Sequence, residues 1–305
     1  EEIMGINLCK VAAILLALSL LAGALCAVAG YMYLRPYMSS RVDDALLNVA
    51  RSGGTSRLYA YTFSDRVQRE GEAYEIGPLC GGSTLYEYAC MERIPRAMID
   101  AFVAIEDKRF WQHEGVDFLR TGEAAVAYAK KKISGTGGKS FGASTITQQL
   151  VKNLTGDDRV SIDRKITEMF SALDLERRAS KGEIMEMYLN VINLADGCRG
   201  VGAAAKHYFG KSVDRLTVGE CACIAAITNS PTYYDPIRNP QNNERRRQLI
   251  LSQMLDQGYI SEEAYTAAKD EPVVLRVKES NRESTVNSWY VDMVIEDVMN
   301  DLIEQ

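Results

Sequence analysis

Two adjacent acids, two aromatic residues and one of the chain's two histidines occur together in AIEDKRFWQHEG, residues 104–115. If this stretch is helical, Glu106, Phe110 and His113 lie on one face, because they follow one another at spacings of four and three residues. A carboxylate beside an aromatic ring is partly desolvated, which makes it a better base. Glu106 is therefore a candidate general base, and the simpler interpretation is a capped helix end with a structural histidine.

Hydroxyl and amide side chains follow in GTGGKSFGASTITQQLVKN, residues 135–153. The glycines predict a loop that leads into a helix, and Thr145 and Gln148 have the spacing of a capping box. The free N–H groups of such a helix start, together with nearby hydroxyls and amides, are suited to an anionic oxygen. Lys152 could reach the same face, because it lies seven residues after Thr145. A well-capped helix start with no ligand is the plainer alternative.

Basic side chains are concentrated between residues 130 and 165, where the local balance is about +5 in a chain of net charge -6. A cationic patch on an acidic protein favours a phosphate-bearing partner or an anionic lipid surface. The acidic total argues against a general nucleic-acid binder. Arg164 and Glu168, in RVSIDRKITEM, could also be an i,i+4 pair on a solvated surface. The basic residues are Lys130, Lys131, Lys132, Lys139, Lys152, Arg159, Arg164 and Lys165, against Asp157, Asp158 and Asp163.

The elements that position these groups are mostly helical from Pro95 onward. Apolar residues recur at helical spacing in MIDAFVAIEDKRF, and Ser180 and Glu183 have capping-box spacing at the start of SKGEIMEMYLN. RRRQLILSQMLDQGYISEEAYTAAKD predicts two helices separated at Gly258, with Ser261 capping the second. Upstream, SRLYAYTFS predicts a strand, and the glycine-rich GPLCGGSTLYEYA predicts a turn leading into a second strand.

An uncharged run from Val11 to Leu34 predicts a membrane helix. At 1.5 Å per residue it would be roughly 36 Å long, enough for a hydrocarbon core about 30 Å thick. The alternative is a signal peptide, but its apolar region is normally only about 7–15 residues. The cysteines predict little: Cys221 and Cys223 lie in an apolar run, and spacing alone cannot establish a Cys80–Cys90 disulfide.

Five motifs occur in an order that resembles the family 51 glycosyltransferases: EDKRFWQHEG, GASTITQQLVKN, RKITE, KGEIMEMYLN and GVGAAAKHYFGK. These are the peptidoglycan glycosyltransferases of class A penicillin-binding proteins and of monofunctional transglycosylases. The resemblance extends over about residues 94–272. It implies a mainly α fold, with a lysozyme-like lobe and a smaller membrane-facing jaw that we expect at 116–135.

The resemblance also implies a domain order and a location. We expect a cytoplasmic remnant at 1–10, a transmembrane helix at 11–34, a small β-containing stalk at 35–90 and the glycosyltransferase domain at 91–272. Residues 273–305 would then be a linker toward a transpeptidase domain that is absent here. Such a protein crosses the cell membrane once and places its catalytic domain outside the cytoplasm.

The chemistry that the resemblance implies is polymerisation of lipid II into β-1,4-linked glycan, with inversion and release of polyprenyl pyrophosphate. Glu106 matches the general base, and Glu168 matches a second acid that positions the donor diphosphate. No tightly bound cofactor is expected and no residue is assigned to a metal, but the resemblance leaves open a divalent ion, Mg²⁺ or Mn²⁺, through which Glu168 would act on the diphosphate. The expected partners are lipid II, the growing lipid-linked glycan, the membrane and cell-wall synthesis proteins, and no nucleic acid.

Twelve further residues match or approach positions that face the substrate or shape its pocket. Arg159 lies one position away from the family arginine, and CRGVG, residues 198–202, lacks the aromatic residue that usually precedes the central glycine. A catalytically silent scaffold of cell-wall assembly and a lysozyme-like glycoside hydrolase are the competing interpretations, and a cationic patch has no purpose in hydrolysis. The twelve residues are Asp107, Phe110, His113, Ser144, Thr145, Gln148, Gln149, Lys152, Asn153, Arg159, Arg164 and Lys165.

Overall fold

The structure is a computed structural model that describes residues 85–134, 144–156, 159 and 161–276, the strands at 57–61 and 73–78, and residues 10–19, 21–23, 25 and 32. Residues 10–19 are helical. Within these described ranges, no helix combines the length and the hydropathy needed to cross a bilayer. Part of the predicted membrane helix at 11–34, and residues 277–305 of the predicted linker, lie outside the described residues.

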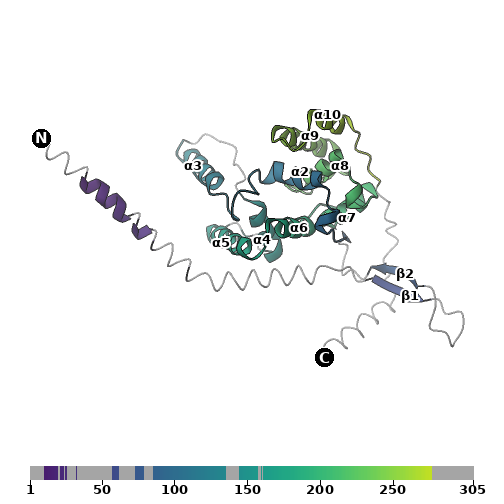
Figure 1. Cartoon of the computed structure of the whole chain (residues 1–305), viewed down its shortest axis with the longest axis horizontal. Helices are drawn as coiled ribbons and strands as arrows, with labels where there is room; N and C mark the ends of the chain where they lie inside the picture. The colour runs from purple at the N-terminus through teal and green to yellow at the C-terminus, as the bar shows by residue number, and fades with distance from the viewer. Residues whose placement is uncertain are drawn as a thin grey trace, which may run out of the picture.

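The prediction of a mainly helical fold is confirmed (Figure 1). The capping boxes predicted at Thr145–Gln148 and Ser180–Glu183 both form, and the side chain of Ser261 caps its helix as predicted. Gly258, with a φ of 73°, separates the two C-terminal helices. The helices are α2 (Arg96–Glu106), α3 (Phe118–Ser134), α4 (Ile146–Thr155), α5 (Ile162–Arg178), α6 (Lys181–Val191), α7 (Gly200–Phe209), α8 (Val218–Ile227), α9 (Pro240–Asp256) and α10 (Glu262–Asp270), with single 3₁₀ turns η1 (Met91–Arg93) and η2 (Val213–Arg215).

The strands form two small sheets. β1 (Arg57–Tyr61), which confirms the strand predicted in SRLYAYTFS, pairs antiparallel with β2 (Ala73–Pro78). The strand predicted after the glycine-rich turn is β3 (Leu85–Tyr86), and it pairs in parallel with β4 (Cys198–Arg199). The segment after β3 is attached to α6. The Asn190 side chain on that helix accepts from the N–H of Ala89 and donates to the Ala89 carbonyl, both at 2.8 Å.

The core lies between two groups of helices on either side of α2. α8 and α9 pack against α2, while α4 packs against α5 and α6 (Figure 1). α8 is apolar around most of its circumference, and such a helix must be buried on all sides. The predicted core thiols Cys221 and Cys223 are fully buried there. Cys90 is a free thiol, and Cys80 lies outside the described residues.

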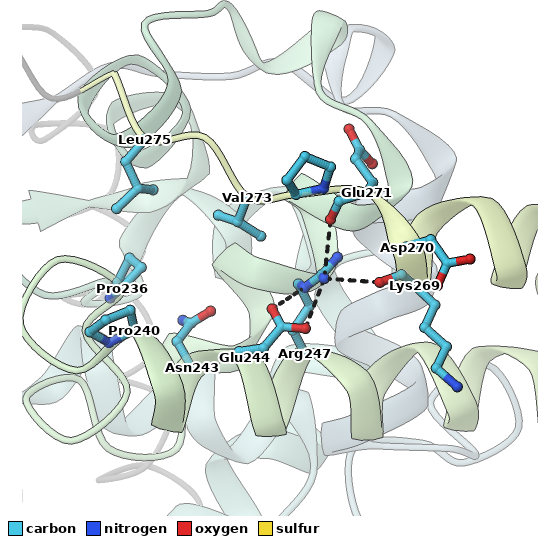
Figure 2. Close-up of a pocket in the computed structure, with 11 residues that line it drawn as sticks. Pro236, Pro240, Asn243, Glu244, Arg247, Lys269, Asp270, Glu271, Val273 and Leu275 are labelled. Carbon is cyan, nitrogen blue, oxygen red and sulfur yellow. Dashed lines mark hydrogen bonds and ion pairs between the residues drawn. The ribbon is translucent and has the colours of Figure 1, made fainter.

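Arg247 ties α9 to the C-terminal end of α10. Its guanidinium group donates to the carboxylate of Glu244 and to the backbone carbonyls of Ala268, Lys269 and Glu271 (Figure 2). Helix ends leave carbonyl groups without partners, and this buried arginine satisfies them. The same side chain borders a pocket of about 400 Å³, whose lining also includes Pro236 and Leu275.

Candidate active site

Glu106 is the last residue of α2, and this corrects the predicted helical face. The N–H of Phe110 donates to the carbonyl of Asp107 at 3.0 Å and not to that of Glu106, whose carbonyl accepts from the Arg120 guanidinium at 2.7 Å. The backbone of Asp107 is not helical, with a φ of −152° and a ψ of 79°. Phe110 lies in the following turn and is completely buried, and His113 contacts Asp107. Phe110 and His113 therefore do not form one helical face with Glu106.

Three side chains from three different elements donate hydrogen bonds to the carboxylate of Glu106. Gln149 Nε2, on α4, lies 3.0 Å from Oε2. Thr228 Oγ1, directly after α8, lies 2.9 Å from Oε1, and Arg246 Nη2, on α9, lies 3.3 Å from the same oxygen. These hydrogen bonds fix the Glu106 side chain, and 13% of it is exposed, so the carboxylate can still be reached from solvent.

Tyr188 on α6 orients the amide of Gln149. The Tyr188 hydroxyl donates to Gln149 Oε1 at 3.0 Å, which leaves Nε2 to face Glu106. Burial, together with the charges of Glu106 and Asp107, raises the pKa of Tyr188 well above its ordinary value. The hydroxyl therefore keeps its proton and remains a donor to Gln149.

Asp107 fixes the start of α4 behind the site. Its Oδ2 accepts from the backbone N–H of Ile146 at 3.0 Å and contacts His113 Nε2 at 2.8 Å. The N–H of Gly115 donates to His113 Nδ1 at 3.1 Å, so the histidine proton is on Nε2 and is donated to Asp107. The Thr145 hydroxyl donates to the Gly115 carbonyl at 2.6 Å, which fastens the turn to the cap of α4.

Part of the predicted site is buried behind Glu106. The buried side chains hold the backbone that carries Glu106 and are closed off from solvent, so in this structure they support the site without facing a substrate. They are Asp107, Phe110, Thr145 and Gln148, each at most 1% exposed. His113, with 8% of its side chain exposed, belongs with them.

Glu168 on α5 forms a second cluster with two cations. Arg164 Nη1 lies 2.7 Å from Glu168 Oε2, and Lys165 Nζ contacts Oε1. The i,i+4 pair therefore forms, but the Glu168 side chain is buried, so the alternative of a pair on a solvated surface is wrong. Lys165 also donates to Ser144 Oγ at 2.8 Å, just before the cap of α4. The formal charges of these three side chains add up to +1, and charged donors of this kind form strong hydrogen bonds with anions.

Helix α4 connects the two clusters. Gln149 on this helix reaches Glu106, whereas Ser144, just before its cap, reaches Lys165. Lys152 lies three residues after Gln149 and is therefore a neighbour of Gln149 on the helix surface. Lys152 and Asn153 are exposed, and Lys152 has no ion-pair partner among the described residues. Arg159 is also exposed. The side chains of Lys131, Lys132 and Lys139 lie outside the described part of the chain.

The described residues do not fit a metal held by the protein. Both oxygens of Glu168 accept bonds from cationic side chains. Over the ranges that the structure describes, no three His, Cys, Asp or Glu side chains gather as a ligand set. A divalent ion at Glu168 would share the carboxylate with Arg164 and Lys165, whose positive charges would repel it.

Thr228 and Arg246 were missed by the sequence analysis. They contact Glu106 from 122 and 140 residues away along the chain, and no local spacing signals such a contact. A partial signal exists for Thr228, because it ends the apolar run of α8. A polar residue at the end of a buried helix must find a partner at the edge of the core.

Curated proteins with similar sequences were found. Penicillin-binding protein 1A/1B of Bacillus subtilis (strain 168) is 40% identical over 223 residues, which cover 71% of this chain and 24% of that protein. Penicillin-binding protein 1A of Aquifex aeolicus (strain VF5) is 41% identical over 214 residues, which cover 70% of this chain and 28% of that protein. The chain thus spans about a quarter of the length of these curated relatives.

A solved structure and a family model were also found. The crystal structure of penicillin-binding protein 1A from Haemophilus influenzae is 24% identical, covers 75% of this chain and 23% of that chain, and gives a TM-score of 0.41. The family described as Transglycosylase matches residues 78–255, which include both clusters of the candidate site. Because this match extends over more than half of the 305 residues, the chain belongs to the transglycosylase family.

Proposed function

We propose that this chain polymerises lipid II as a peptidoglycan glycosyltransferase, with Glu106 as the general base. One observation carries the proposal: α4 contacts both clusters. Its residue Gln149 is one of three donors to the partly exposed carboxylate of Glu106, and Ser144, just before its start, bonds Lys165 of the positively charged Glu168 cluster. Membership of the transglycosylase family supports the reaction class.

In the proposed reaction, Glu106 takes the proton from the 4-hydroxyl of the acceptor GlcNAc. The acceptor oxygen forms a bond to the anomeric carbon of the donor sugar as the bond from that carbon to the phosphate oxygen breaks. The pyrophosphate leaves with the electron pair, and attack from the opposite face inverts the configuration. One carboxylate is sufficient, because pyrophosphate leaves without needing a proton from an acid.

The cationic residues stabilise the negative charge that develops on the pyrophosphate. Lys152 is exposed on α4, and Arg164 and Lys165 are held in place by Glu168. In this proposal Glu168 positions the two cations, so its effect on the diphosphate is indirect. No tightly bound cofactor is required, and any divalent ion would arrive with the diphosphate.

The proposed location is the outer face of the cell membrane, with residues 11–34 as the single membrane helix. α3, at the edge of the molecule in Figure 1, exposes Phe118, Leu119 and Val126, each by more than half. Apolar side chains gathered at one edge favour contact with a bilayer. Arg120, on the same helix, bonds the carbonyl of Glu106, so a lipid-borne substrate at α3 would lie near the base. Other cell-wall synthesis proteins are the expected partners.

The hydrolase alternative is disfavoured by the hydrogen bonds at both acids. A glycoside hydrolase needs one protonated carboxylic acid to donate to the leaving oxygen. Every described partner of the Glu106 carboxylate is a donor, and both oxygens of Glu168 accept from cations. Among the described residues, Arg246 at Glu106 and both cations at Glu168 can only donate hydrogen bonds, so they cannot accept one from a protonated acid. A catalytically silent scaffold remains the second candidate, because CRGVG departs from the family motif.

The experiment is product analysis after incubation of labelled lipid II with the detergent-solubilised chain. Glu106→Gln is compared with Glu114→Gln, an exposed glutamate in the turn after α2. The proposal predicts glycan polymer from the wild type and from Glu114→Gln, and none from Glu106→Gln. Equal polymer from all three would overturn the assignment of the base. Cleavage of preformed glycan would favour the hydrolase, and bound but unreacted lipid II would favour the scaffold.

A further inference from the structure

The three donors to Glu106 are not equivalent. An ionised carboxylate has about four lone-pair positions, two on each oxygen. Among the described residues, Oε1 accepts from both Thr228 and Arg246, whereas Oε2 accepts only from Gln149. One lone pair therefore remains open, and it belongs to Oε2.

The Thr228 hydroxyl group has two possible hydrogen-bond acceptors. Its hydroxyl oxygen lies 2.9 Å from Glu106 Oε1 and also 2.9 Å from the carbonyl oxygen of Ala225. A hydroxyl group has a single proton to donate, so Thr228 serves one of these two acceptors at a time. Arg246 is always charged and has five donors, so it is the constant donor to Oε1.

The surroundings of Arg246 hold its guanidinium group against Glu106. The guanidinium carbon lies 5.0 Å from the centre of the Tyr234 ring, a distance suited to a cation–π contact. The side chain is only 13% exposed. Its Nε is buried and has no hydrogen-bond partner among the described residues, so the contact with Glu106 is its main polar anchor. The neighbouring Arg247 points instead toward Lys269 and Glu271 (Figure 2).

We infer that Arg246 is a positioning residue that fixes the Glu106 carboxylate, so that Oε2 is the oxygen that accepts the proton of the acceptor hydroxyl. This inference rests on the proposed function. When the sugar O–H bond breaks, the proton bonds to the open lone pair of Oε2, while Arg246 and Thr228 keep Oε1 turned away from the acceptor. Without Arg246, Oε1 has an open position too, and the carboxylate is free to rotate.

The test compares three variants in lipid II polymerisation. Arg246→Met removes the donor but keeps an unbranched side chain over Tyr234, and Arg246→Lys keeps a positive charge and a donor. Arg245→Met is the matched control, because Arg245 is the adjacent arginine on α9 and is exposed. Its hydrogen-bond partners within the described part of the chain, Gln241 and Asn242, belong to its own helix. Thermal unfolding of each variant shows whether the fold is retained.

We expect Arg246→Met to lower kcat at least about tenfold, as for the loss of a hydrogen bond to a charged group, with KM unchanged within about twofold. Arg246→Lys should recover part of the loss, and Arg245→Met should match the wild type. A kcat for Arg246→Met within about twofold of the wild type, a loss carried by KM alone, or no recovery with lysine would overturn the inference. In each of these outcomes the wild type still polymerises lipid II, so the proposed function would be unaffected. Absence of polymer from the wild type would overturn both.

Discussion

Removing the hydroxyl group of Tyr188 should slow the reaction without any change in a group that touches the substrate. In Tyr188→Phe, Gln149 Oε1 loses the donor that lies 3.0 Å away. The amide is then free to rotate by half a turn and present its oxygen to Glu106 in place of its N–H group. Two acceptors facing each other repel, so the base would lose one of its three donors for part of the time.

The magnitude follows from the burial of this pair. Tyr188 is fully buried, and an unsatisfied buried acceptor costs about 1–3 kcal/mol. We therefore expect the free energy of unfolding to fall by about 1–2 kcal/mol. Loss of one neutral hydrogen bond to the base should reduce kcat about five- to tenfold, with little change in KM.

Tyr208→Phe separates this effect from simple destabilisation. Tyr208 is also fully buried and donates its hydroxyl to the carbonyl of Leu194 at 2.8 Å. Both variants are measured by denaturant unfolding and by initial rates of lipid II polymerisation. We expect similar losses of stability and a reduced kcat only for Tyr188→Phe. Equal kcat values for the two variants would refute the reasoning that Tyr188 acts through Gln149.

Three further predictions concern the surroundings of the site. Gly115→Ala should strongly destabilise the chain in thermal unfolding, because φ is 91° and a Cβ would lie 2.6 Å from a backbone carbonyl oxygen of α5; an unchanged midpoint would contradict this. Burial raises the pKa of Asp117, but its bonds with Arg109 and the N–H of Arg120 outweigh this and hold the pKa below the ordinary 3.8. Its stabilisation is therefore present above about pH 4 and lost as the pH falls further, so unfolding of Asp117→Asn should depend less on pH in that range. Burial raises the pKa of Cys223 to about 12, so at pH 8 a thiol reagent should label Cys90 and leave Cys223 unmodified until the chain unfolds, as mass spectrometry would show.

The features that the sequence predicted well are local. The capping boxes at the starts of α4 and α6 depend on residues three positions apart, and the Arg164–Glu168 pair depends on one helical turn. Gly258 ends α9 because a positive φ suits glycine there. Each of these signals is complete within a few residues, so no knowledge of the rest of the fold was needed.

The features that the sequence did not predict depend on contacts between distant segments. α2 ends at Glu106 because Arg120 takes its carbonyl and Asp107 turns to bond Ile146. The helical periodicity of residues 98–105 contains no sign of that end. The contacts of Thr228 and Arg246 with Glu106 likewise exist only once α8 and α9 have packed against α2.

The central claim is that Glu106 is the base of a lipid II polymerase, and the rate of polymer formation by Glu106→Gln tests it most directly. Gln retains the size of the side chain and can still bond Gln149 or Thr228, but it cannot accept the proton of the acceptor hydroxyl. We expect kcat to fall at least about a hundredfold, as for the loss of a general base, while lipid II still binds. A kcat within about tenfold of the wild type, with the fold and lipid II binding intact, would contradict the account.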